Sequence, residues 1–128
     1  MNELEMSAGL PATPGYRYAK LCGQQLHVAG QVPHDSSGKI VGADDPYQQA
    51  LRCLENLTTL LACHDFSREI QRFTVYVVGP RSNLTAAWQA VLERFNNDVP
   101  PATLLGVTVL GHEAQLVEVD AVVARNGA

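Results

Sequence analysis

The pattern of hydrophobic and polar residues divides the chain into short segments separated by Gly and Pro. Residues 16–22 and 26–29 are typical of two short strands, and residues 23–25 form a plausible hairpin turn between them. Residues 1–13 lack periodicity and predict an irregular N-terminal segment. Residues 31–44 are rich in Pro, Asp, Ser and Gly and predict a loop.

Two segments carry the apolar period of a helix. The first is expected to begin at Asp45 and Pro46, because Asp is a favoured N-cap and Pro suits the first helical position. Its apolar residues recur every three or four positions up to Cys63, which leaves Gln49 on the polar face. The second helix is expected to be capped by Ser82 and to end before the two prolines at 100–101.

Three further strands are predicted at residues 73–78, 103–109 and 116–124. The resulting order is β-β-α-β-α-β-β within one domain of 128 residues. A hairpin followed by two strand–helix crossovers predicts an α+β fold, a mixed sheet with two helices on one face. The other face would be left uncovered by its own chain, and an apolar open face indicates an oligomer interface.

The last strand contains the most informative pattern in the chain. Side chains alternate across a strand, so four apolar residues should pack on the helices: Val117, Val119, Ala121 and Val123. Glu118 and Asp120 then share the opposite face, about 7 Å apart along the strand. Carboxylates inside a sheet require solvent, an ion-pair partner or a functional site. The pattern alone leaves these alternatives open.

Composition excludes several classes of function. The chain has 9 Lys and Arg against 13 Asp and Glu, without a basic patch for nucleic-acid phosphates. No apolar run reaches the ~20 residues of a membrane span, and the acidic N-terminus does not resemble a secretory signal, so a cytoplasmic protein is expected. The cysteines and histidines lack metal-ligand spacing, so no metal is expected. The chain has neither a P-loop nor a GxGxxG motif, and no cofactor is expected. His34 beside Asp35 is expected to be a surface pair.

Several motifs, in unbroken order over about residues 14–124, resemble the Rid (reactive intermediate deaminase) or YjgF family. They are Gly-Gln-Val-Pro at 30–33, Gly-Lys-Ile-Val at 38–41, the Gln-Ala-Leu and Leu-Glu-Asn-Leu helix segments at 49–57, Val-Tyr-Val at 75–77, Pro-Pro-Ala at 100–102 and Leu-Val-Glu-Val-Asp-Ala at 116–121. The resemblance implies a chorismate-mutase-like α+β fold. It also implies a homotrimer in which three sheets form a central barrel, with small-molecule clefts between subunits.

The resemblance also implies a site. Glu118 matches a Glu thought to orient the water that hydrolyses an imine to a keto acid and ammonia. The substrate-binding positions of the family fall on Tyr16, Ala29, Gly30, Thr103 and Leu105.

Three of these positions depart from the family's pattern. Ala29 stands where a Ser is usual, and Leu105 where a Cys is frequent. Thr103 stands where active members have an Arg that clamps a substrate carboxylate through two charged hydrogen bonds. Thr cannot make that contact, so the substrate preference is expected to differ from that for an α-imino acid.

Two functions are compatible with a site in which some positions match the family and others depart from it. The first is an enamine or imine deaminase, a hydrolase with Glu118 as catalytic residue and an altered substrate preference. The alternative is a non-catalytic small-molecule-binding or regulatory trimer in which Glu118 is structural. A nuclease or translation inhibitor, an activity attached to some relatives, conflicts with the net charge of -4.

Overall fold

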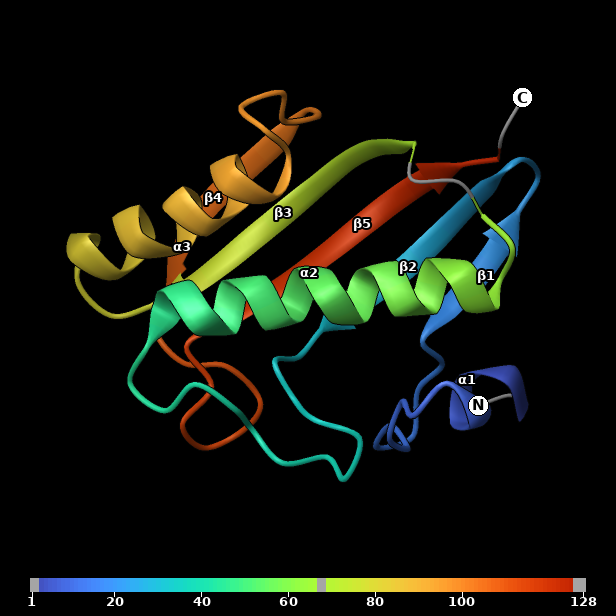
Figure 1. Cartoon of the computed structure of the whole chain (residues 1–128), viewed down its shortest axis with the longest axis horizontal. Coiled ribbons are helices and arrows are strands. Elements are labelled where there is room, and N and C mark those ends of the chain that lie inside the picture. Colours follow the sequence, from blue (N-terminus) through green and yellow to red (C-terminus); the bar gives the residue numbers. More distant parts are fainter. Residues whose placement is uncertain (1–2, 67–68, 126–128) are drawn as a thin grey trace.

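The computed structural model describes residues 3–66 and 69–125. It shows one five-stranded mixed sheet and three helices (Figure 1). In chain order the elements are α1 (Glu3–Ser7), β1 (Ala19–Cys22), β2 (Gln25–Gln31), α2 (Pro46–Cys63), β3 (Ile70–Val78), α3 (Arg81–Arg94), β4 (Ala102–Val107) and β5 (Val117–Ala124). No helix among the described residues is long and apolar enough to cross a membrane.

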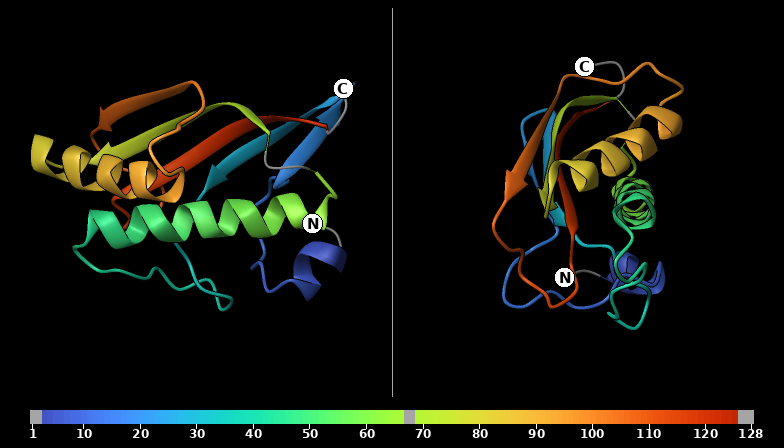
Figure 2. Two further views of the ribbon diagram at one scale, coloured as in Figure 1. Left: turned by 45° about the horizontal axis from the view of Figure 1, so that its top comes forward. Right: turned by 90° about the vertical axis from the view of Figure 1, so that its left-hand side faces the viewer.

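The strands lie in the order β1-β2-β5-β3-β4. Neighbours are antiparallel except β3 and β4, which are parallel and joined through α3. The two long helices, α2 and α3, both cover one face of the sheet, and the other face is left open (Figure 2). The predicted α+β fold, with a mixed sheet and two helices on one face, is therefore confirmed.

The buried core lies between the sheet and α2. Val117, Val119, Ala121 and Val123 of β5 are buried, and the residues between them are partly exposed on the open face. They pack with buried leucines of α2 such as Leu54, Leu57 and Leu60. The alternation predicted for the last strand is confirmed, and it fixes Glu118 on the face away from the helices.

The first predicted helix start is confirmed and the second is wrong. Asp45 caps α2, and its carboxylate accepts the backbone N–H of Gln48 at 3.1 Å. Helix α3 begins at Arg81 after Pro80, with no side-chain cap, so Ser82 lies inside its first turn. The backbone carbonyl of Pro80 accepts the N–H of Asn83 at 2.9 Å, so one donor of the first turn is satisfied without a capping side chain.

The N-terminal region differs from the prediction in two places. Residues 3–7 form the short helix α1 instead of an irregular segment, because the buried Glu5 carboxylate contacts His64 Nε2 at 2.7 Å and fixes the turn to α2. Strand β1 begins at Ala19 and not at Tyr16. The hydroxyl of buried Tyr18 donates to Pro11 O, whereas Tyr16 lies before the strand and is 42% exposed.

Candidate functional site

A hollow of about 320 Å³ opens where the end of β2 meets the start of β5. The two strands are antiparallel, so the C-terminal residues of β2 lie beside the N-terminal residues of β5. Loops from three other parts of the chain reach the same ends of these two strands (Figure 1). The hollow is lined by Pro14, Tyr16, Gly30, Val32, Gly111, His112 and Glu118.

The Glu118 carboxylate lies directly against Gly30. A Cβ placed on Gly30 would overlap Cδ and Oε2 of Glu118, so only glycine leaves the carboxylate in this position. On its other oxygen, Glu118 Oε1 accepts the side-chain amide of Gln115 at 3.3 Å. The carboxylate is therefore held from both sides at the wall of the hollow.

The pKa of Glu118 is raised above its ordinary value, mainly because partial burial disfavours the charged form. The negative charge of Asp120 raises this pKa further, while the Gln115 hydrogen bond and nearby His112 lower it. Tyr16 across the hollow also has a raised pKa, because of burial and the Glu118 charge, so its hydroxyl keeps its proton and is available as a donor. The site thus combines a basic carboxylate with a neutral hydroxyl.

Two buried glutamines hold the loop that carries one wall of the hollow. Gln115 donates to Val117 O at 3.1 Å as well as to Glu118, and its Oε1 accepts the backbone N–H of His112 at 3.2 Å. Gln49 of α2 accepts the N–H of Leu116 at 2.7 Å and donates to Ala114 O at 2.8 Å. Gln49 is fully buried, so its predicted place on the solvent-facing polar side of the helix is wrong.

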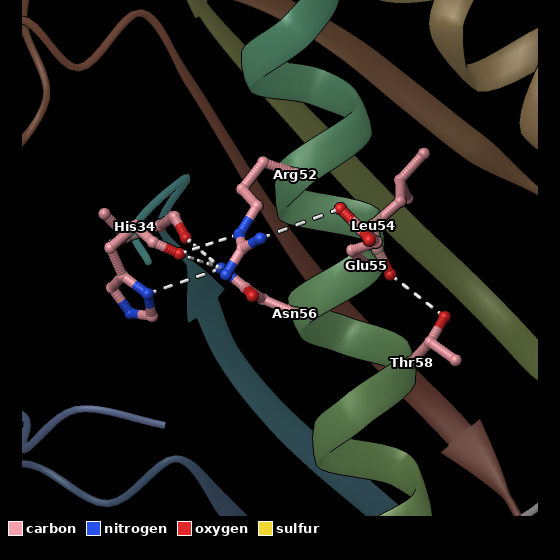
Figure 3. A network of polar contacts seen from close by, with 7 residues as sticks. His34, Arg52, Leu54, Glu55, Asn56 and Thr58 are labelled. Carbon is pink, nitrogen blue, oxygen red and sulfur yellow. Dashed lines mark hydrogen bonds and ion pairs between the residues drawn. The ribbon is translucent and has the colours of Figure 1, made fainter. Parts of the chain in front are cut away.

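The opposite wall is fastened to α2 (Figure 3). The side-chain amide of Asn56 donates to Val32 O at 2.8 Å and His34 O at 3.0 Å, and Arg52 Nε donates to His34 O at 2.9 Å. His34 is buried, contrary to the expected surface pair with Asp35, because these bonds draw its backbone onto the helix. Burial lowers the pKa of His34.

The second carboxylate of the pair has a different environment. Asp120 accepts the Tyr76 hydroxyl at 2.7 Å, and this bond is the main reason for the raised pKa of Tyr76. Asp120 lines a separate hollow of about 350 Å³ on the open face, together with His27 and Arg72. The structure thus separates the two acids: one is held by a phenol, and the other faces the hollow at Gly30.

The predicted site residues fall into two groups. Tyr16, Gly30 and Glu118 meet in one hollow. Ala29 precedes Gly30 but is not part of the described wall. Thr103 and Leu105 lie on β4, beyond β3, in register with Thr74 and Tyr76. Glu118 also pairs with Tyr76, so Leu105 is two strands away, about 10 Å between Cα atoms.

Sequence reasoning missed His112, Gln115, Gln49 and Asn56. The last three are amides whose roles depend on tertiary contacts, which no local period reveals, although Gln49 and Asn56 belong to the helix motif that carried the resemblance. His112 was visible only as a turn residue before the last strand. Among the described residues, no group of three or more His, Cys, Asp or Glu side chains could hold a metal ion.

Comparison with known proteins agrees with this architecture. The family model described as Endoribonuclease L-PSP matches residues 6–125. No curated protein matches the sequence.

Among solved structures, the YjgF gene product of E. coli is 21% identical with a TM-score of 0.80, covering 93% of this chain and 95% of that one. TdcF of E. coli, solved with bound serine, is 21% identical with a TM-score of 0.80, covering 91% and 92%. A Yersinia pestis protein of unknown function from the conserved Rid family is 21% identical with a TM-score of 0.78, covering 88% and 90%. These likenesses show the shared fold, and the family match over residues 6–125 shows that the chain belongs to the YjgF/Rid family, whose model is described as Endoribonuclease L-PSP.

Proposed function

We propose that this protein hydrolyses a reactive imine or enamine to a carbonyl compound and ammonia, with Glu118 as the general base. One observation carries the proposal: the Glu118 carboxylate is held at the wall of a hollow between Gln115 and Gly30, with a raised pKa. A half-buried carboxylate with a raised pKa is a stronger base than an ordinary surface acid. It therefore suits the removal of a proton from an attacking water molecule.

The chemistry requires few groups. A water molecule beside Glu118 would attack the imine carbon while its proton passes to the carboxylate. The hydroxyl of Tyr16, kept protonated by its raised pKa, would bind the polar end of the substrate across the hollow. The TdcF structure with bound serine supports a small polar ligand for a fold of this kind.

The substrate proposed here differs from an α-imino acid bound through a guanidinium. The wall of the hollow contains neither Lys nor Arg among the described residues, and Thr103 cannot supply the bidentate contact that the family resemblance assigns to its position. Losing such a contact costs about 2–4 kcal/mol, or roughly 30- to 1,000-fold in kcat/KM. The proposed substrate is an imine or enamine without an α-carboxylate, or one that holds this group elsewhere.

We also propose that the active form is a homotrimer with ligand clefts between subunits. The open sheet face and the edge strand β4 support it, because Leu105 is 44% exposed and Val109 beyond the strand is 74% exposed. Large apolar side chains at an edge strand are a liability unless a partner covers them. Size-exclusion chromatography with light scattering is expected to give three times the chain mass. A mass of 13.8 kDa at micromolar concentration would contradict the trimer.

A panel of imines and enamines, with and without an α-carboxylate, tests the proposed activity. The purified protein is expected to release ammonia faster than the buffer from at least one substrate without the carboxylate. A different result would favour the alternative, a non-catalytic small-molecule-binding or regulatory trimer. In that case, ammonia release with protein would be no faster than release in buffer alone for every panel compound, and one of the compounds would bind tightly.

A further inference from the structure

We propose that the imidazole of His112 is a second catalytic group of this hollow: its charged form protonates the substrate nitrogen while Glu118 takes the proton of the attacking water. The proposal rests on the hydrolysis proposed above and adds the acid that this reaction needs. It assigns to the loop before β5 a role that none of the residues carrying the family resemblance supplies.

The geometry places both groups at the same hollow. Three of the described wall residues can ionise, namely Tyr16, His112 and Glu118, and only His112 contributes a nitrogen acid. Gln115 ties the two parts together, because one amide group bonds both the Glu118 carboxylate and the backbone N–H of His112. An imidazolium and a carboxylate in one hollow form an acid–base pair suited to neutral pH.

The surroundings of His112 have a mixed charge. Glu118 from β5 is the carboxylate at the same hollow, and the positive charge of His112 lowers the pKa of Glu118. His34, from the loop after β2, is close enough for the two histidines to repel when charged, but burial already lowers the pKa of His34 and keeps that ring neutral. Tyr16 is neutral, since its pKa is raised, and Glu113 is the acidic neighbour in the same loop. Of these two acids, Glu118 is the one that lines the same hollow as His112.

The proton transfers balance without a cofactor. As the water oxygen bonds to the imine carbon, its proton goes to Glu118, and the C=N electron pair moves to nitrogen, which accepts the His112 proton. The product is a neutral carbinolamine. Glu118 then returns its proton to the amine, the C–N bond breaks, and ammonia leaves with the electron pair. The hydroxyl proton passes to His112, which restores both groups and leaves a carbonyl compound.

The test is the pH dependence of ammonia release by wild-type protein, His112→Asn, His112→Gln, Glu118→Gln and, as the matched control, Glu113→Gln. Glu113 is the exposed neighbour in the same loop and is not part of the wall. Both His112 variants are expected to lose about 100-fold in kcat and to lose the fall in rate at alkaline pH that accompanies deprotonation of the imidazole. Glu113→Gln is expected to keep the wild-type maximal rate and to keep an alkaline limb, because the imidazole itself is still present.

A second measurement does not depend on turnover. Carbon-13 NMR of the Glu118 carboxyl is expected to show a higher pKa in His112→Asn than in wild type, because a nearby positive charge has been removed. The same variant with an unchanged Glu118 titration would overturn the pairing.

The outcomes separate the two proposals. If Glu118→Gln abolishes turnover while the His112 variants keep the wild-type rate and alkaline limb, the proposed hydrolysis stands and His112 has no catalytic role. If the His112 variants lose rate but keep the alkaline limb, His112 acts only on loop shape, and the inference is overturned. Two results would overturn the proposed function and the role of His112 with it. One is a Glu118→Gln variant that releases ammonia at the wild-type rate, and the other is wild-type protein that releases ammonia no faster than buffer without protein.

Discussion

The two regions that contain the predicted site residues are built very differently. Around Glu118, four segments of one chain meet, and buried amides fix the carboxylate, the loop and the opposite wall. On β4, Thr103 is exposed and Leu105 is 44% exposed, and neither side chain carries a charge. The difference indicates that a single chain already orders the proposed base. In the proposed reaction, recognition of the rest of the substrate would depend on other groups or on a second subunit.

The largest effect is expected from introducing a guanidinium on β4. Thr103→Arg should raise kcat/KM for an α-imino acid by roughly 30- to 1,000-fold, because a bidentate charged contact becomes possible. Ammonia release from matched imines with and without the carboxylate measures the effect. A control, Thr103→Lys, places a positive charge at the same position without the paired donors of a guanidinium. Equal gains on substrates with and without the carboxylate, or equal gains from both variants, would contradict a bidentate contact from β4 to the carboxylate.

Gly30→Ala is expected to lower kcat by about 100-fold while leaving the fold intact. The added methyl must push the Glu118 carboxylate away, and the flexible end of that side chain can move without disturbing the backbone. Gly106→Ala on β4 is the matched control, because a Cβ there meets only Leu84 atoms at 3.8 Å. Circular dichroism and turnover distinguish the two. A Gly30→Ala protein with full activity would mean that the position of the carboxylate does not matter.

Gln115→Leu should lower kcat by about tenfold and shift the acidic limb of the pH profile upward. The Gln115 hydrogen bond favours the ionised carboxylate, so its loss raises the Glu118 pKa, and the base is then lost at a higher pH. The buried amide also serves two backbone groups, so unfolding in urea should show a loss of about 1–3 kcal/mol. An unshifted acidic limb in a folded variant would argue against this role of Gln115.

The smallest expected effect is on stability. Burial raises the pKa of Glu118, so the folded chain binds this proton more tightly than the unfolded chain does. Ionised Glu118 therefore reduces stability as pH rises above the usual carboxyl range. Glu118→Gln is expected to be more stable than wild type at neutral pH by less than about 1 kcal/mol, because solvent screens a half-exposed group. The gain in stability should vanish in acid. A gain that grows in acid would mean that folding lowers the pKa of Glu118 instead of raising it.

The sequence predicted features that depend on residues close together in the chain, and it missed features that depend on distant ones. Local signals placed β5 and its buried face correctly, because alternation is a property of the strand itself. The Asp45 cap was equally local. Gly30 and Glu118 were paired only through the family resemblance, and their contact arises from the antiparallel register of β2 and β5. Gln49 was misplaced because its partners lie 65 and 67 residues away in the chain.

The central claim is that Glu118, and not its neighbour on the same face of β5, is the base. A matched pair of carboxyl-to-amide changes tests it: Glu118→Gln, and Asp120→Asn, which keeps an oxygen for the Tyr76 hydroxyl. On a substrate found in the panel, Glu118→Gln is expected to reduce kcat by about 100-fold or more, and Asp120→Asn by much less, with the mass in solution unchanged in both. Equal losses from the two variants, or wild-type turnover by folded Glu118→Gln, would contradict the claim.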